Sequence, residues 1–281
     1  MIIVKSVSEI TAIIDKYNSE GVEIGFVPTM GALHQGHLEL VRRCVSENKI
    51  CIVSIFVNPT QFNDKNDYIK YPRTIEDDCN ALNNYFRPQD IVFIPEEKEL
   101  IGNKIIGNFD FGNLESVMEG KHRPGHFKGV GFIVYELFKL IKPVRAYFGE
   151  KDYQQLQIIK CLVSQFNLDI SIIACPTIRE TDGLAMSSRN VRLTNEHRLI
   201  APKLYKTLLY MKKRASEQKD VKQLIEEALG LLLPPIKVEY IEIVDQNTLE
   251  ASNKIEDRAL VCCLAAKLGD VRLIDNIIIN N

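Results

Sequence analysis

The sequence lacks three features that would place it among membrane, secreted or nucleic-acid-binding proteins. Its 281 residues contain no apolar run of about 18 residues, the minimum for a membrane-spanning helix. The opening segment, MIIVKSVSEI, has none of the basic, apolar and small-residue regions of a secretory signal peptide. The 35 lysines and arginines are balanced by 37 aspartates and glutamates, whereas a large nucleic-acid footprint needs clustered basic charge. These absences favour a cytoplasmic globular protein of one or two domains that binds neither membranes nor nucleic acids.

A disulfide framework is also missing. The seven cysteines are odd in number and form no Cys-x-x-Cys pair. Four of them lie inside apolar runs, where a cysteine acts as a small hydrophobic side chain: Cys51, Cys175, Cys262 and Cys263. We therefore expect structural thiols rather than metal-binding, redox or catalytic ones.

The first part of the chain alternates short apolar runs with amphipathic helical patterns. The strand-like runs are residues 23–27 (broken by Pro28), 50–57, 91–94, 145–148 and 170–174. Helical patterns cover residues 6–21, 74–86, 127–141 and 154–166, and another begins near residue 36. Five strands separated by helices predict an α/β fold with a Rossmann-like parallel sheet and helices on both faces. The aperiodic, glycine-rich stretch 96–125 predicts a binding loop or an inserted hairpin.

The pattern changes after about residue 178. Helical stretches near 196–213 and 219–232 are followed by strand-like runs at 238–244, 260–264 and 271–274. This order predicts a smaller C-terminal α+β domain. We expect domain boundaries of 1–177 for the nucleotide- and substrate-binding domain and 178–281 for a lid domain.

The segment PTMGALHQGH (28–37) follows a predicted strand and enters a predicted helix. The start of a helix presents unpaired backbone N–H groups and a positive dipole, which suits a phosphate. His34 and His37 lie on the same side of this turn and can donate hydrogen bonds to phosphate oxygens. The alternative is a capped helix with two surface histidines, which is weaker because two of only five histidines share this turn.

Two familiar nucleotide-binding motifs do not fit. Gly31 and Gly36 have the spacing of a P-loop, but His37 and Leu38 replace its Lys and its Ser or Thr. Gly129 and Gly131 are followed by Val134 where a dinucleotide fingerprint needs a third glycine. Transfer of a γ-phosphoryl group and hydride transfer therefore both lose support.

Three further polar segments follow predicted strands or the domain boundary. They are NPTQF (58–62), GEKDYQQ (149–155) and ETDGLAMSSRN (180–190). Each has a plainer interpretation as a loop, a solvated turn or an interdomain linker. Since ligands of open parallel sheets bind beyond the carboxyl ends of the strands, their common placement favours a shared site.

These segments carry a resemblance to a known family. Residues 28–37 resemble the HxGH signature of nucleotidylyl transferases and class I aminoacyl-tRNA synthetases. The wider set resembles pantothenate synthetase: the segments above, YPRT (71–74), EGKHRPGHFKGV (119–130), VEYIEIVD (238–245) and RLIDN (272–276). The resemblance spans nearly the whole chain.

The resemblance implies an AMP-forming pantoate–β-alanine ligase. In this reaction the carboxylate of (R)-pantoate attacks the α-phosphorus of ATP to give pantoyl adenylate and pyrophosphate. The amine of β-alanine then attacks the acyl carbon, which releases AMP and pantothenate. The resemblance further implies Mg²⁺ with the ATP, small-molecule substrates as the only ligands, and a homodimer.

The resemblance also implies a role for each matching residue. His37, His34 and Lys151 are the expected catalytic residues. The expected ATP-binding residues are Met30, Gly31, His34, His37, Gly149, Glu150, Lys151, Asp152, Ile178, Met186, Ser187, Ser188 and Arg189. Gln61 and Gln155 are expected to bind pantoate, with Asn58, Arg123 and His126 as further candidates. Asp77 and Asp78 are candidate Mg²⁺ ligands, although acidic residues at a helix start have an equally good explanation in the helix dipole.

Two alternatives remain open at this point. Another HxGH adenylyl or cytidylyl transferase would stop at a nucleotide conjugate. A non-catalytic nucleotide-binding protein would bind ATP without releasing pyrophosphate.

Overall fold

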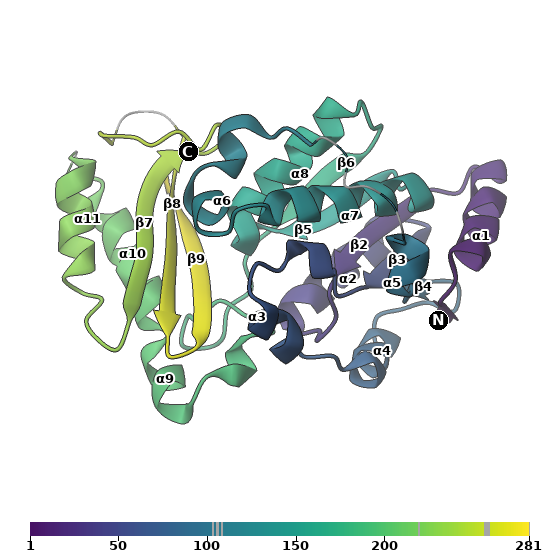
Figure 1. The fold of residues 1–281 in the computed structure, drawn as a ribbon, viewed down its shortest axis with the longest axis horizontal. Coiled ribbons are helices and arrows are strands. Elements are labelled where there is room, and N and C mark those ends of the chain that lie inside the picture. Colours follow the sequence, from purple (N-terminus) through teal and green to yellow (C-terminus); the bar gives the residue numbers. More distant parts are fainter. Residues whose placement is uncertain (103, 105–106, 108, 219, 256–258, 281) are drawn as a thin grey trace.

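The computed structural model describes residues 1–102, 104, 107, 109–218, 220–255 and 259–280. Figure 1 shows a parallel sheet flanked by helices beside a smaller antiparallel sheet. The parallel sheet has the strand order β1-β4-β3-β2-β5-β6. Its strands are β1 (Ile2–Val4), β2 (Ile24–Thr29), β3 (Ile50–Ile55), β4 (Ile91–Phe93), β5 (Arg145–Gly149) and β6 (Ser171–Cys175).

Helices cover both faces of this sheet, as the sequence predicts. The helices up to β6 are α1 (Val7–Ser19), α2 (Gln35–Glu47), α3 (Lys65–Lys70), α4 (Ile75–Asn83), α5 (Glu97–Leu100), α6 (Met118–His122), α7 (His126–Ile141) and α8 (Tyr153–Gln165). Side chains alternate across a strand, so Phe26 packs with Phe138 of α7 while Val27 packs with Val41 of α2. Burial on both faces explains why these strands are continuous apolar runs.

The C-terminal part is built on the antiparallel sheet β7-β8-β9. Its elements are α9 (Asn195–Ile200), α10 (Lys203–Arg214), α11 (Val221–Leu229), β7 (Lys237–Asp245), β8 (Leu260–Leu268) and β9 (Val271–Asn280). Cys262 and Leu264 of β8 face the α10–α11 layer, whereas Val261 and Cys263 pack toward Met118 of the N-terminal part. The small sheet therefore joins the two parts through an apolar contact.

The fold class is confirmed, and the differences from the predicted elements have local causes. The sheet has six strands instead of the five predicted. The additional strand, β1, was not predicted because it is only three residues long and shows no recognisable alternation. Strand β2 continues past Pro28 to Thr29. The backbone groups of Thr29 point toward β3, where the Thr29 carbonyl accepts the Phe56 N–H at 3.0 Å. Those of the preceding residue, Pro28, therefore point toward β5, and the pairing of β5 with β2 ends before Pro28, at Phe26. The missing N–H of Pro28 therefore costs no ladder hydrogen bond.

Two other segments also differ from expectation. The helix predicted over 196–213 is divided into α9 and α10 at Pro202, which lacks the N–H that a continuous helix needs. The stretch 96–125 is not a hairpin: its described residues contain α5, the 3₁₀ turn Gly112–Glu115 and α6. Residues 103, 105, 106 and 108 of this stretch lie outside the described residues.

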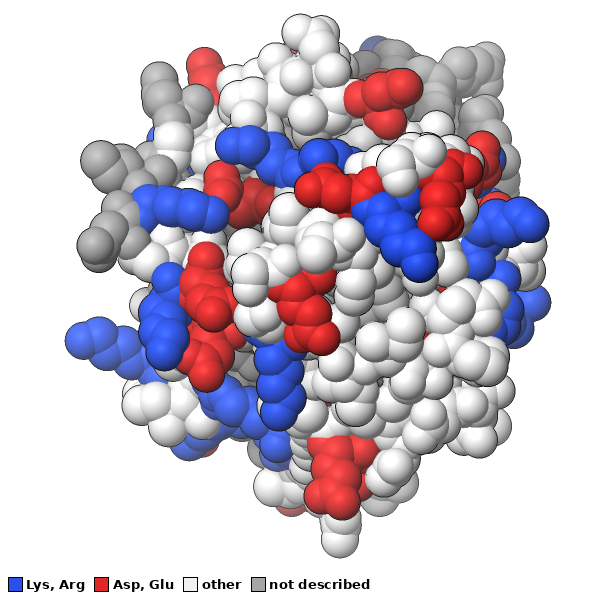
Figure 2. Space-filling view, turned by 90° about the vertical axis from the view of Figure 1, so that its right-hand side faces the viewer, with Lys and Arg blue, Asp and Glu red and all other residues white. Residues whose placement is uncertain are grey.

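Within the described ranges, no helix is both long and apolar enough to cross a membrane. On the face shown in Figure 2, basic and acidic side chains are interspersed. All seven cysteines are unpaired, and five of them are buried.

The packing of α7 against the turn after β3 generates a stability prediction. A Cβ on Gly129 would lie 2.3 Å from the backbone oxygen of Thr60, so we expect Gly129→Ala to lower the free energy of unfolding by about 1–3 kcal/mol through overpacking. Urea denaturation measures this change. Gly107→Ala is the control, because its Cβ would meet the Phe109 ring at 3.6 Å, an ordinary contact. An equally stable Gly129→Ala protein would contradict this account of the packing.

Candidate active site

The loops after four strands of the parallel sheet meet at one edge and enclose a cavity of about 200 Å³. The strands are β2, β3, β5 and β6, and the strand order reverses between the neighbours β2 and β5. Ligands of open parallel sheets bind at such a crevice. The lining includes these residues named in the sequence analysis: Met30, His34, His37, Asn58, Gln61, Gly149, Lys151, Asp152, Gln155, Ile178, Met186, Ser187, Ser188 and Arg189.

Two residues of the predicted nucleotide site, Gly31 and Glu150, do not line this cavity. Gly31 has a φ of +77°, and a Cβ there would lie 2.9 Å from Oδ2 of Asp78, so the course of the loop requires glycine. The backbone oxygen of Glu150 accepts a hydrogen bond from Nδ2 of Asn276 at 2.9 Å. Both residues thus shape the backbone around the cavity.

The two histidines of the HxGH segment cap the start of α2. Nδ1 of His34 accepts the Gly36 N–H at 3.1 Å, and Nδ1 of His37 lies 3.4 Å from the His34 N–H. A ring nitrogen that accepts a hydrogen bond carries no proton, so in the neutral ring the proton is on Nε2. Both imidazoles can therefore donate a hydrogen bond from Nε2.

Burial keeps these imidazoles neutral. It lowers the pKa of His34 to about 4, and the ammonium of Lys151 contributes to the shift. Burial also lowers the pKa of His37 well below its ordinary value, together with the nearby His34 and Lys151. The ring centroids are 4.1 Å apart, so two imidazolium charges would repel each other strongly. At neutral pH the pair therefore supplies two uncharged N–H donors beside the Lys151 side chain.

Asp78 holds the loop that carries these histidines. Its buried carboxylate accepts the N–H of Ala32 at 2.9 Å on Oδ2 and the N–H of Leu33 at 2.7 Å on Oδ1. Asp77 is exposed, and neither aspartate lines the cavity. Asp78 thus has a structural role in this loop, and no cluster of three or more acidic, His or Cys side chains that could hold a metal occurs among the residues described. Mg²⁺ binding by Asp77 and Asp78, directly or through water, stays a prediction.

Gln61 is held at the other side of the cavity. Its Oε1 accepts from Nδ2 of Asn58 at 3.1 Å, and its Nε2 lies 2.9 Å from Sδ of Met30. Nδ1 of His126 lies 2.7 Å from the backbone oxygen of Gln61. Because a carbonyl only accepts, this Nδ1 carries the proton. Asn58 and His126 therefore support Gln61 from its side chain and its backbone.

The segment 187–189 closes the cavity from the C-terminal side. The hydroxyl of Ser188 donates to the backbone oxygen of Ala32 at 3.0 Å, which ties this segment to the HxGH loop. Arg189 forms an ion pair with Asp67 of α3 at 2.8 Å, and Asp67 also pairs with Arg192 at 2.7 Å. Lys151 lies 3.8 Å from the carboxylate of Asp152. Cations from distant parts of the sequence thus border one cavity.

The apolar wall of the cavity and the acidic partner of Arg189 could not be predicted from the sequence. The wall comes from α7 and consists of Val130, Ile133, Val134 and Leu137. Helical periodicity shows that α7 is amphipathic, but it does not separate core positions from cavity positions. Asp67 lies 122 residues from Arg189 in the sequence, and no local pattern connects them.

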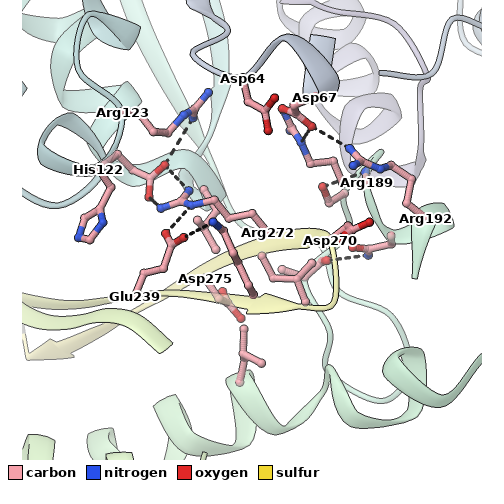
Figure 3. A pocket seen from close by; sticks show the side chains of 18 of the residues that line it. Asp64, Asp67, His122, Arg123, Arg189, Arg192, Glu239, Asp270, Arg272 and Asp275 are labelled. Carbon is pink, nitrogen blue, oxygen red and sulfur yellow. Dashed lines mark hydrogen bonds and ion pairs between the residues drawn. The ribbon is translucent and has the colours of Figure 1, made fainter. Parts of the chain in front are cut away.

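A second cavity, of about 460 Å³, lies between the N- and C-terminal parts and shares four lining residues with the first. The shared residues are Lys151, Asp152, Ser187 and Arg189. Figure 3 shows that charged side chains from both parts point into it, including Arg123, Arg272 and the Asp67 pairs. The cavity at the carboxyl edge of the sheet therefore opens into a polar space between the two parts.

A family model described as pantoate-beta-alanine ligase matches residues 2–278. The chain belongs to this family. The resemblance read from the motifs is thus confirmed, and the family includes curated pantothenate synthetases close to this chain. That of Azobacteroides pseudotrichonymphae genomovar. CFP2 is 49% identical over 284 residues, which cover 99% of each chain. That of Bacteroides fragilis is 45% identical over 280 residues, which cover 99% of this chain and 98% of the relative.

Solved structures of the family agree with the fold over the whole chain. Pantothenate synthetase from Thermus thermophilus superposes with a TM-score of 0.92 and 38% identity, and 100% of each chain is covered. A pantoate-beta-alanine ligase from Francisella tularensis, complexed with beta-gamma ATP and beta-alanine, superposes with a TM-score of 0.80 and 38% identity. That match covers 99% of this chain and 98% of the Francisella chain.

The buried His126 predicts a pH dependence of stability. Burial lowers the pKa of His126 to about 3, and the charge of Arg123 adds to the shift. Below about pH 6.5 the unfolded chain takes up a proton at this residue that the folded protein does not bind. The free energy of unfolding should therefore fall as the pH falls from about 6.5 toward 3, by up to about 1.4 kcal/mol per pH unit for this one group.

Urea denaturation without ATP at a series of pH values tests this expectation. In His126→Asn the slope of the unfolding free energy against pH should become shallower by that amount, because an amide does not titrate. The exposed His122, replaced in the same way, is the control and should leave the slope as it is. An unchanged slope in His126→Asn would show that this residue is not buried in its neutral form.

Proposed function

We propose that the chain catalyses the reaction of its family, the ATP-dependent condensation of pantoate with β-alanine, in the cavity at the carboxyl edge of the parallel sheet. One observation carries the proposal: His34, His37, Lys151 and the segment 187–189 border the same cavity as Gln61 and Gln155. Donors for a triphosphate and amides for a hydroxy acid are thereby brought together. The activity follows from family membership, and the assignment of residues to roles is our inference.

In the first step, the pantoate carboxylate attacks the α-phosphorus and pyrophosphate leaves. A carboxylate is ionised near neutral pH and needs no general base. The step needs stabilisation of charge on the phosphates, which Nε2–H of His34 and His37, the Lys151 ammonium and Arg189 can supply. We assign His37 as the principal donor to the transition state, since it is the more buried of the two imidazoles.

Gln61 and Gln155 hold pantoate in this scheme. An amide both donates and accepts, so it can bind hydroxyl and carboxylate groups together. Met30, Gly149, Ile178 and Met186 frame the nucleoside, and Asp152 accepts from ribose hydroxyls. The apolar wall from α7 suits the methyl groups of pantoate.

In the second step, the amine of β-alanine attacks the acyl carbon and AMP leaves. The acyl adenylate must be kept from water until the amine arrives. The bonds from Ser188 to Ala32 and from Arg189 to Asp67 support a lid role for the C-terminal domain, 178–281, over the N-terminal domain, 1–177.

We treat Mg²⁺ as part of the substrate, bound to ATP through phosphate oxygens. Phosphate oxygens and water satisfy the preference of Mg²⁺ for hard oxygen ligands without a protein cage. The hydrogen bonds of Asp78 support this choice over direct ligation by Asp77 and Asp78.

The decisive experiment is incubation of the purified protein with ATP, pantoate and β-alanine. We expect pantothenate and AMP, with AMP release dependent on β-alanine. Another HxGH transferase would give a nucleotide conjugate with no such dependence. A nucleotide-binding protein without activity would release no pyrophosphate.

His37→Ala should slow adenylate formation by roughly 10²–10³, the usual loss when one transition-state donor is removed. Single-turnover pyrophosphate release measures this step separately from the second. His197→Ala is the control, since His197 lies on α9 outside the cavity. An unchanged rate in His37→Ala would remove this imidazole from the mechanism.

We further propose that the protein acts as a homodimer in the cytoplasm. The family resemblance supports the dimer, and seven unpaired thiols are typical of a reducing compartment. Sedimentation equilibrium distinguishes a 32.0 kDa monomer from a species of twice that mass.

A further inference from the structure

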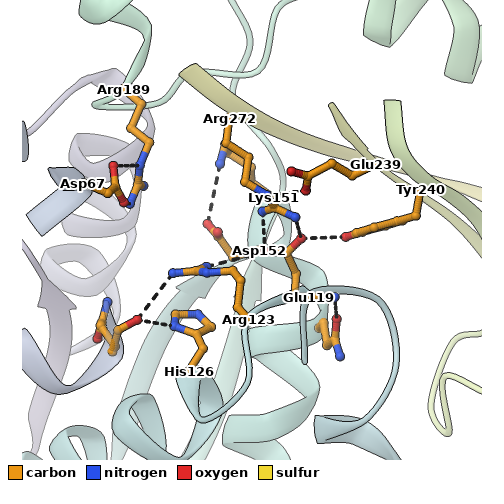
Figure 4. Close-up of polar contacts among 12 residues, drawn as sticks. Asp67, Glu119, Arg123, His126, Lys151, Asp152, Arg189, Glu239, Tyr240 and Arg272 are labelled. Carbon is orange, nitrogen blue, oxygen red and sulfur yellow. Dashed lines mark hydrogen bonds and ion pairs between the residues drawn. The ribbon is translucent and has the colours of Figure 1, made fainter. Parts of the chain in front are cut away.

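A buried carboxylate joins the C-terminal sheet to the pantoate side of the site. Glu119 of α6 accepts two hydrogen bonds of 2.6 Å from the guanidinium of Arg272 on β9, one at each oxygen. Tyr240 of β7 donates to Oε1 at 2.8 Å. Figure 4 shows these side chains of the small sheet converging on the one carboxylate. Burial raises the pKa of Glu119, but the hydrogen bonds and charge of Arg272 outweigh it, so the pKa lies at about 2.

The segment that begins at Glu119 leads directly to Gln61. The backbone oxygen of Glu119 accepts the Arg123 N–H at 2.8 Å, and that of Arg123 accepts the His126 N–H at 3.0 Å. His126 then donates to the backbone oxygen of Gln61 at 2.7 Å. The guanidinium of Arg123 lies 3.5 Å from both the Glu119 carboxylate and that same oxygen of Gln61.

Glu119 also contacts the residue that precedes the second pantoate glutamine, Gln155. Its backbone N–H donates to Oε1 of Gln154 at 3.0 Å, and Nε2 of Gln154 donates to the backbone oxygens of Leu114 and Val117 at 2.7 and 2.9 Å. Gln154 is fixed by these three bonds, and it is the neighbour of Gln155 at the start of α8. The backbone of Gln61 is thus contacted directly from the segment around Glu119, and the backbone that carries Gln155 is held through its neighbour Gln154.

We propose that Glu119 and Arg272 form a positioning pair, through which the position of the C-terminal sheet determines the placement of Gln61 and Gln155. The affinity for pantoate then depends on how the C-terminal sheet packs against the N-terminal part. This inference rests on the proposed function of the two glutamines. Both members of the pair line the 460 Å³ interdomain cavity but not the 200 Å³ cavity, so within the smaller cavity the pair acts through other residues. A buried ion pair often adds little net stability, whereas it restricts two surfaces to one arrangement.

The test compares Michaelis constants for the two first-step substrates by pantoate-dependent pyrophosphate release. In Glu119→Gln, an amide N–H₂ opposes the guanidinium, and we expect the KM for pantoate to rise about tenfold, within the range known for coupling residues. The KM for ATP should change less than about twofold, because the contacts from Glu119 to Gln61 and Gln154 include none of the proposed phosphate donors. Arg272→Lys keeps the charge but loses the bidentate contact with Glu119. It should raise the KM for pantoate by a smaller factor and leave the KM for ATP nearly unchanged.

Arg214→Lys is the matched control, because Arg214 pairs with Glu217 and Glu227 within the C-terminal part. It should leave both constants unchanged. Thermal unfolding identifies a variant that fails to fold, and Arg272→Lys then carries the test. Equal increases in both KM values, or an unchanged KM for pantoate, would overturn the proposal. If the unaltered protein forms no pantothenate, the proposed function fails instead, so the two failures are distinguishable.

Discussion

The structure of the site depends on the hydrogen bonds between the Asp78 carboxylate and the N–H groups of Ala32 and Leu33. The loop after β2 turns through two residues with positive φ, Gly31 and Ala32, and its backbone donors would otherwise lack partners. With the loop held in this way, His34 and His37 cap α2 through Nδ1, and each Nε2 remains available for a ligand. One buried carboxylate, which does not line the cavity, thus holds the loop in which both imidazoles are oriented through Nδ1.

The C-terminal strand β9 organises the site from the opposite side. In addition to Arg272, it carries Asp275, which pairs with Arg179 at 2.6 Å where the chain enters the 180–190 segment. It also carries Asn276, whose amide donates to the backbone oxygens of Glu150 and Lys151. Three segments that border the cavities are therefore attached to one strand. This arrangement gives a physical reason for the polar residues in RLIDN, which interrupt an otherwise apolar strand.

Local patterns were sufficient to predict most of the fold, because strands buried on both faces and amphipathic helices have distinct periodicities. β1 could not be predicted, since a three-residue strand has no period. The gathering of most candidate residues around one cavity could be predicted, because HxGH and its companion motifs follow strand ends, where a parallel sheet brings them together. The role of Asp78 was not found: a carboxylate that accepts from backbone N–H groups and one that binds a metal look identical in sequence. Contacts such as Arg189 with Asp67 depend on the tertiary structure alone.

The ion pairs of Asp67 bear on Arg189, which we propose to bind phosphate. Asp67 accepts from Nε and Nη2 of Arg189, so a phosphate group that approaches that edge of the guanidinium takes the place of the carboxylate. Binding at that edge is then an exchange of one anion for another. Such an exchange weakens the hold on a phosphate group and favours release of a highly charged product, because the departing anion leaves behind a guanidinium with a partner ready to return.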